Sequence, residues 1–359
     1  MKETKFKNTE IGMIPEEWEV KKLGTVFDIG NGRDYKHLNT GKIPVYGTGG
    51  LMTYVNEYLY DGETVCIGRK GTINMPQYHN GKIWTVDTLF YTYNFRKTDV
   101  KFLYYLAQII DWNAYNTATG VPSLTSRNVS NILVSLPPLH EQHRIASALT
   151  SIDNLISSLG KLIEKKKNIK QGAMQQLLTG RTRLKGFSEP WVEKKLGELF
   201  KIGNGKDYKN LKSGPIPVFG TGGLMTYVNE YLYDGETICI GRKGTIDKPQ
   251  YHKGKIWTVD TLFYTYRFKD INVKYLYYLS TTINWNEYNT ATGVPSLTSQ
   301  NILKIKVVLP LEEEQQAIAT ILTKMDDEIT ALEAKKVKYE AIKQGMMQQL
   351  LTGKIRLVS

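Results

Sequence analysis

The stretch from Ile145 to Gly180 reads IASALTSIDNLISSLGKLIEKKKNIKQGAMQQLLTG, and a related stretch from Ile318 to Gly353 reads IATILTKMDDEITALEAKKVKYEAIKQGMMQQLLTG. In both stretches apolar residues recur alternately every four and three positions, which is the a/d spacing of a coiled coil. The predicted seam contains Ile145, Leu149, Ile152, Ile156, Leu159 and Ile163, and in the second stretch Ile318, Leu322, Met325, Ile329 and Leu332, resuming at Tyr339, Met346 and Leu350. Lysines also fall on the seam, and we expect them to weaken its distal part or leave it open for another partner: Lys166, Lys170, Lys336 and Lys343.

Each stretch predicts a helix of roughly 33 residues, about 50 Å long. Neither helix has a globular core of its own. The simplest way to bury two such apolar stripes in one chain is to pack the helices against each other as an antiparallel coiled coil.

The two stretches belong to a longer internal repeat. Trp18 recurs as Trp191 and Gln175 as Gln348, and no gap is needed between these positions. Two long copies indicate a duplicated unit of one domain plus one helix, whereas solenoids use shorter repeats in larger number. We therefore expect a pseudo-two-fold arrangement.

Each copy begins with a mixed α/β domain. Short runs rich in Val, Ile, Thr and Tyr, separated by Gly and Asp-Gly, predict strands within residues 43–50, 51–60, 63–73 and 82–93. An apolar-periodic segment at 100–110 predicts a helix, a loop NTATGVPSLTS follows at 116–126, and one more strand leads into the long helix. The fold class is α+β, with two mixed α/β domains and two long helices.

The bulk composition restricts the function. The formal net charge of +12 favours a polyanionic partner, with DNA or RNA first. No run of about 18 apolar residues predicts a membrane span, and the N-terminus has no apolar segment typical of a signal peptide. Cys66 and Cys239 lie at equivalent places in apolar runs, so we expect buried thiols in a reducing cytoplasm.

Motifs of catalysis are not found in the sequence. GNGRDY and GTGGLM both fail the G-x-G-x-x-G pattern, GRKGT lacks Walker-A spacing, and no N/D-P-P-Y/F segment of an amino-methyltransferase is present. We expect His79 and His252 to be turn or packing residues, and no metal site is predicted. Asp87 and Asp260, in WTVDTLF, are interpreted as buried carboxylates that accept backbone hydrogen bonds.

The candidate nucleic-acid contacts lie in loops. Arg and Lys suit phosphates, Arg can also read guanine in the major groove, and glycines allow close backbone approach. For each candidate the alternative is an ordinary solvated loop or turn. For the 119–125 loop the alternative is a structural connection to the next strand. The candidates are Arg33, Tyr35, Lys36, Thr48, Gly49, Arg69, Lys70, Thr72, Thr119 and Ser123, and in the second repeat Lys206, Tyr208, Lys209, Thr221, Gly222, Arg242, Lys243, Thr245, Thr292 and Ser296.

The order of these segments along the chain, and their repetition, resemble the specificity (S) subunit of a type I restriction-modification system. The resemblance is carried by TEIGMIPEEWEV, PVYGTGG, IGRKGT, TVDTLF, TGVPSLT, LPPLHEQHRIA and QQLLTGRTRL, echoed by QQLLTGKIRL. The two variable domains of that family usually differ in sequence, whereas here they are near copies.

The resemblance implies target-recognition domains at 1–138 and 181–311 and long helices at 139–180 and 312–359. It implies a non-catalytic subunit in which each repeat reads one half of a bipartite DNA site, while the helices set the spacing and dock the methyltransferase subunits. Because the two repeats are near copies, we expect that site to be palindromic or nearly palindromic. The implied partners are double-stranded DNA, two methyltransferase (M) subunits and restriction/translocase (R) subunits, which would supply S-adenosylmethionine binding and ATP/Mg chemistry. The alternative is a stand-alone DNA-binding or scaffold protein without enzymatic partners.

Overall fold

The computed structural model describes residues 5–358, so residues 1–4 and 359, at the outer ends of the first predicted domain and the last predicted helix, lie outside the described residues. The chain divides into two compact units. One comprises the described residues up to Gly160 and from Ala334 onward, and the other comprises Lys161–Glu333. The division falls inside both long helices, so each unit holds one mixed α/β domain and a part of each helix.

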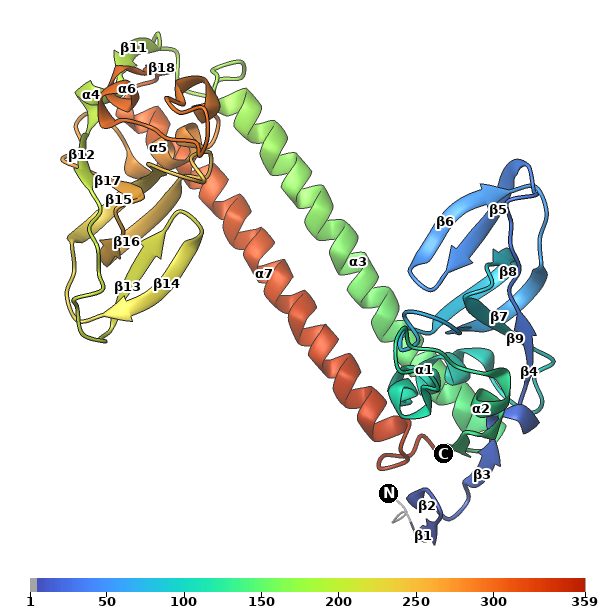
Figure 1. Cartoon of the computed structure of the whole chain (residues 1–359). Coiled ribbons are helices and arrows are strands. Elements are labelled where there is room, and N and C mark those ends of the chain that lie inside the picture. The colour runs from blue at the N-terminus through green and yellow to red at the C-terminus, as the bar shows by residue number, and fades with distance from the viewer. Residues whose placement is uncertain (1–4, 359) are drawn as a thin grey trace. The chain divides into compact units, whose positions relative to one another are not determined.

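The first unit contains a six-stranded sheet (Figure 1). Its order is β4-β9-β7-β8-β5-β6, with β5 and β8 parallel and the other neighbours antiparallel. The strands are β4 (Asp28–Asn31), β5 (Thr40–Gly47), β6 (Gly50–Val55), β7 (Tyr60–Gly68), β8 (Gln77–Thr85) and β9 (Leu89–Tyr93).

The second unit repeats this sheet in the order β12-β17-β15-β16-β13-β14. Its strands are β12 (Lys201–Asn204), β13 (Ile216–Gly220), β14 (Gly223–Val228), β15 (Tyr233–Gly241), β16 (Gln250–Thr258) and β17 (Leu262–Tyr266). The predicted strand segments are confirmed, except that the segment 82–93 contains the end of β8 and all of β9 with a turn between them. Strands β4 and β12 lie in glycine-rich stretches and were not predicted.

Smaller elements complete each unit. The predicted helix is confirmed as α1 (Val100–Ile109) and α5 (Val273–Ser280). Two short sheets pair β3 (Glu19–Lys22) with β10 (Leu133–Leu136) and β11 (Val192–Lys195) with β18 (Lys306–Leu309). The sequence reasoning did not anticipate the hairpin of β1 (Phe6–Thr9) and β2 (Gly12–Pro15), nor the short helices α2 (Ser126–Asn131), α4 (Leu196–Leu199) and α6 (Ser299–Lys304).

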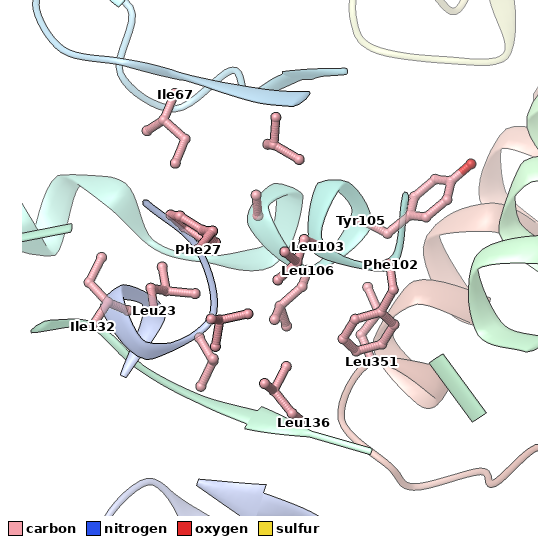
Figure 2. Packing of buried hydrophobic residues seen from close by; sticks show 14 of the residues in the cluster. Leu23, Phe27, Ile67, Phe102, Leu103, Tyr105, Leu106, Ile132, Leu136 and Leu351 are labelled. Carbon is pink, nitrogen blue, oxygen red and sulfur yellow. The ribbon is translucent and has the colours of Figure 1, made fainter. Parts of the chain in front are cut away.

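Helix α1 forms the centre of the first unit's core. It begins where Asp99 accepts a hydrogen bond from the Phe102 amide, 2.7 Å away, which caps the helix. Figure 2 shows its apolar face between Ile67 of the sheet and Leu136 of β10. Burying each such side chain is worth about 1.5–3 kcal/mol relative to leaving it in water. This core holds the sheet rigidly against the helix segments of the same unit.

The long helices are α3 (Leu139–Leu177) and α7 (Glu312–Leu350), each 39 residues long instead of the roughly 33 predicted. Both begin soon after a proline, as expected, but about six residues ahead of the first seam isoleucine. Each helix is followed by a glycine with positive φ, Gly180 at 69° and Gly353 at 71°, a conformation that ends helices at little cost for glycine.

Within each unit the segments of α3 and α7 pair antiparallel. In the first unit Lys343 of α7 lies 2.7 Å from Asp153 of α3, and in the second Lys166 of α3 lies 2.8 Å from Glu328 of α7. The half-buried residues of the predicted seam are Ile152, Ile156, Met325, Leu332, Tyr339 and Met346, and the buried ones are Ile145, Leu149, Leu159, Ile163, Ile318, Leu322, Ile329 and Leu350.

The seam lysines are paired, which corrects the expectation that they leave the seam open. Besides Lys343 and Lys166, Lys170 pairs with Asp326 inside the second unit. Because their charges are matched by acids of the facing helix segment, these lysines add polar contacts to the seam instead of interrupting it. Lys336 pairs only along its own helix, with Glu340 at 3.6 Å.

In each unit an ion pair joins the first turn of one long helix to the segment that follows the other long helix. In the first unit Arg356, after α7, donates to both carboxylate oxygens of Glu141 at 2.7 and 2.8 Å, and Trp18 Nε1 donates to Glu141 at 3.1 Å. Glu141 is fully buried. The second unit has the same arrangement, in which Arg183 and Trp191 donate to Glu314.

Candidate nucleic-acid interface

Two candidate loops of the first unit are tied together by their backbones. The Gly71 amide donates to the Pro122 carbonyl at 2.8 Å, and the Leu124 amide donates to the Arg69 carbonyl at 2.8 Å. Between them Lys70 and Ser123 form an isolated antiparallel bridge. Gly71 has φ of 91°, a turn conformation that favours glycine. These contacts join the 117–124 loop to the 69–72 loop and place its tip beside the cations.

The turn at 86–88, between β8 and β9, and the adjacent end of β8 are hydrogen-bonded to two other candidate loops. Its Thr88 carbonyl accepts from the Arg69 amide at 2.8 Å. The Arg33 amide donates to Thr85 at 2.8 Å, and Trp84 Nε1 donates back to the Arg33 carbonyl at 2.8 Å. A Cβ on Gly32 would lie 1.9 Å from the Val86 carbonyl oxygen, so only glycine lets the two backbones approach this closely.

The turn at 47–50 completes the cluster. Gln77 Nε2 donates to the Gly47 carbonyl at 2.9 Å, which fixes the turn against β8. Thr48 Oγ1 would lie 3.8 Å from a Cβ on Gly71, so this turn faces the 69–72 loop. We call the segments 32–36, 47–50, 69–72, 86–88 and 117–124 the loop edge of the first unit.

The second unit has its own loop edge at 205–209, 220–223, 242–245, 259–261 and 290–297, held by the same contacts. Gly244 donates to Pro295 at 2.9 Å, Leu297 to Arg242 at 2.8 Å, and Trp257 Nε1 to Lys206 at 2.8 Å. The predicted candidates of each repeat therefore gather at one edge of one sheet, although they lie far apart in the sequence.

Most candidate side chains at the loop edges reach solvent. Arg33, Lys36, Gly49, Arg69, Lys70, Thr72, Thr119, Lys206, Lys209, Gly222, Arg242, Lys243 and Thr292 are exposed, whereas Tyr35, Thr48, Ser123, Tyr208, Thr221, Thr245 and Ser296 are half-buried. Arg69 is partly oriented, since Nη1 lies 3.3 Å from the Asp87 carbonyl oxygen and the guanidinium lies over Phe90. Exposed cations can meet phosphates, and an oriented guanidinium can read a base.

A groove of about 580 Å³ lies in the second loop edge. Its lining includes Tyr208, Lys209, Thr221, Gly222 and Asp260. Tyr208 packs against a small hydrophobic cluster that contains Val218 and Trp257. The groove thus combines one aromatic ring, one cation, hydroxyl and carboxylate groups, and flexible glycine backbone.

The interpretation of Asp87 and Asp260 as buried carboxylates is wrong. Both residues are exposed at the tip of their turn. Their backbone carbonyl oxygens face Arg69 and Arg242, at 3.3 and 3.4 Å from Nη1. The apolar neighbours in WTVDTLF suggested burial, but the turn that reverses the chain there directs the aspartate outward. The sequence signal was an Asp-Thr pair between two strands, which is typical of a turn.

The histidines of the repeat have packing roles. The His79 ring lies 3.8 Å from the Tyr46 ring, and His252 lies at the same distance from Phe219. Burial lowers the pKa of each imidazole to about 4, so both are neutral near pH 7. Within residues 5–358, no group of three or more His, Cys, Asp or Glu is placed to hold a metal ion.

The expected burial of both cysteines is confirmed. Cys66 and Cys239 are buried and free, and burial raises the pKa of the Cys66 thiol to about 12. Over the part of the chain that the structure describes, no helix combines the length and apolarity that a membrane crossing requires.

Comparison with known proteins gives one consistent family. A family model described as the type I restriction modification DNA specificity domain matches residues 15–171 and again residues 188–342. The type I restriction enzyme MjaVIII specificity subunit of Methanocaldococcus jannaschii is 26% identical, with 99% of this chain and 97% of the relative covered. The EcoprrI specificity subunit of Escherichia coli is 27% identical over 64% of this chain and 61% of its own.

Solved structures share the fold. The S subunit of a type I restriction-modification system from M. genitalium matches with a TM-score of 0.69 at 18% identity, over 93% of this chain and 96% of that one. A second match, from a study of complex assembly and conformational transition of the type I R-M system, has a TM-score of 0.57 at 16% identity, over 95% and 99%.

Proposed function

The chain belongs to the family of type I restriction-modification specificity subunits, and from this premise we propose that each loop edge reads one half of a bipartite DNA site. The observation that carries the proposal is the gathering of five separate segments, rich in exposed cations, at one edge of each sheet. The net charge of +12 favours the approach of a polyanion. Phosphate contacts would set the register, and base contacts would set the sequence.

The two half-sites are near-identical and inverted in this proposal. Residues 47–64 recur letter for letter as 220–237, so the two loop edges present almost the same groups. The loop edges differ at few places, among them Arg33 against Lys206, and His37 against Asn210 lies just beyond. The long helices would set the length of the unread spacer, since 39 residues extend about 58 Å, more than one turn of B-DNA at ~34–36 Å.

The proposed partners are double-stranded DNA, two methyltransferase subunits and the restriction/translocase subunits, in the cytoplasm. This chain would contribute recognition and no catalysis. S-adenosylmethionine would be bound by the methyltransferase subunits, and ATP with Mg by the translocase. The product would be one N6-methylated adenine in each half-site.

Methylome sequencing tests the proposal directly. A strain that expresses this chain with the methyltransferase encoded beside its gene should show a bipartite motif with methyladenine in both halves. The same strain with the methyltransferase alone is the control and should show none. Two unrelated half-sites would refute the inverted-repeat proposal but keep the bipartite one. A chain that binds DNA but neither co-purifies with a methyltransferase nor yields a motif would instead be a stand-alone binding or scaffold protein.

A further inference from the structure

We propose that Asp87 and Asp260 are specificity-determining residues, each of which accepts a hydrogen bond from a cytosine amine in the major groove of its half-site. The inference rests on the proposed function and names one chemical feature of the target. It concerns the aspartate in the turn at 86–88 and in the equivalent turn at 259–261. The sequence pattern had indicated that both side chains are buried.

The backbone groups of the turn make hydrogen bonds that connect the segments of the loop edge. In the second unit the Thr261 carbonyl accepts from the Arg242 amide at 2.8 Å, and the Val259 amide donates to Phe219 at 3.0 Å. The Leu262 amide closes the turn on Val259 at 2.9 Å. These hydrogen bonds fix the backbone of the turn and with it the direction of the Cα–Cβ bond of Asp260.

The carboxylate itself is not used by the fold. Among residues 5–358, no side chain or amide donates a hydrogen bond to the carboxylate of Asp87 or Asp260, and neither forms an ion pair. Asp260 instead lines the groove of the second loop edge, beside Thr221 and Lys209. The first unit places Asp87 by the same backbone contacts, with Thr88 bonded to Arg69 at 2.8 Å.

An unpaired carboxylate in a surface for DNA needs a reason, because phosphates repel it. A carboxylate offers only acceptors, and in the major groove the exocyclic amine of cytosine is the donor that Asp and Glu recognise. Arg242, whose guanidinium lies at the same turn, has the complementary preference for guanine O6 and N7. The pair of residues fits a G·C base pair or two adjacent ones.

The full chain with its methyltransferase provides the test, and Asp260→Ala is the first variant. It should leave methylation in place and relax one position of one half-site, lowering discrimination for cytosine about 5- to 150-fold in competition between matched oligonucleotides. Binding to unrelated DNA should stay equal or become stronger, since a negative charge is lost. Asp87→Ala should relax the corresponding position of the other half-site.

The control is Asp234→Ala, which removes the same charge at the far end of the strand that leads to Arg242. It should leave the motif unchanged. If Asp260→Ala does not fold, the isosteric Asp260→Asn takes its place and should shift the position toward adenine, which Asn reads.

Three results would overturn the inference. An unchanged motif in both Asp variants would refute base reading by these carboxylates while the proposed function stands. Complete loss of methylation in a folded Asp260 variant would indicate a structural role instead. Absence of any motif with the unaltered chain would overturn the proposed function and this inference together.

Discussion

Arg356→Ala removes one partner of the buried ion pair in the first unit. Arg356 is 8% exposed at its side chain and Glu141 is fully buried, so the substitution leaves a carboxylate without a countercharge in the core. Hydrogen bonding to Glu141, which also raises the pKa of Arg356, involves both carboxylate oxygens. Removing one partner of such a pair costs about 3–5 kcal/mol, because the remaining charge stays desolvated.

The loss should be measurable by urea unfolding of the first unit. With a slope of ~2 kcal/mol per M urea for a unit of this size, the midpoint should fall by about 1.5–2.5 M. Hydrogen exchange should show the loss of protection within residues 5–160 and not within 161–333. Lys354→Ala is the matched control, because it removes an exposed cation from the same segment and should change the stability by less than about 0.5 kcal/mol.

A double-mutant cycle separates the pair from its surroundings. Glu141→Gln removes the buried charge, so Arg356→Ala on that background should cost markedly less than on the original chain. A fall in midpoint for Arg356→Ala no larger than for Lys354→Ala would refute the reasoning, as would equal costs of Arg356→Ala with and without Glu141→Gln.

Three further perturbations have defined outcomes. Gly32→Ala should destabilise the first unit by about 3 kcal/mol, because the new Cβ meets a backbone oxygen that cannot move aside, and thermal unfolding should show it. Gly172→Ala, in the C-terminal part of α3, where a new Cβ would meet no atom within 4 Å, should raise stability by about 0.5–1 kcal/mol in the same assay. His79 has a folded pKa of about 4, below its unfolded value of 6.5, so the unfolded state binds the proton first and stability should fall between pH 6.5 and 4. His79→Gln should reduce this loss in urea titrations, whereas Gln at the exposed His140 should not.

The sequence predicted most of the regular structure because the signal is local. Alternation of apolar and β-branched residues marked β5 to β9, and a four-three spacing marked α3 and α7. The apolar spacing alone begins at Ile145, because His140 and Glu141 interrupt it, so the start of the helix near residue 139 was expected only from the family resemblance. In the fold the helix is anchored there by the buried Glu141.

The sequence could not predict which distant loops pair with each other, and the reason is physical. Nothing in the composition of the 69–72 loop indicates that its backbone pairs with the 117–124 loop, since backbone hydrogen bonds carry no residue identity. The seam lysines were also ambiguous, because whether Lys343 weakens the seam depends on Asp153, which lies on the other helix. The candidate residues were selected by their chemistry, and their meeting at one edge could be seen only in the fold.

The pairing of Arg356 with Glu141 has a consequence for the order of folding. The second unit is a continuous piece of chain, Lys161–Glu333, so its contacts can form as soon as that piece has emerged. The first unit consists of two pieces of chain on either side of the second unit, and its buried carboxylate is neutralised only once Arg356, 215 residues after Glu141, has been synthesised. We therefore expect the domain that is translated first to be the last to reach its native stability. A chain truncated just before Arg356 should selectively expose that domain to proteolysis in the cell.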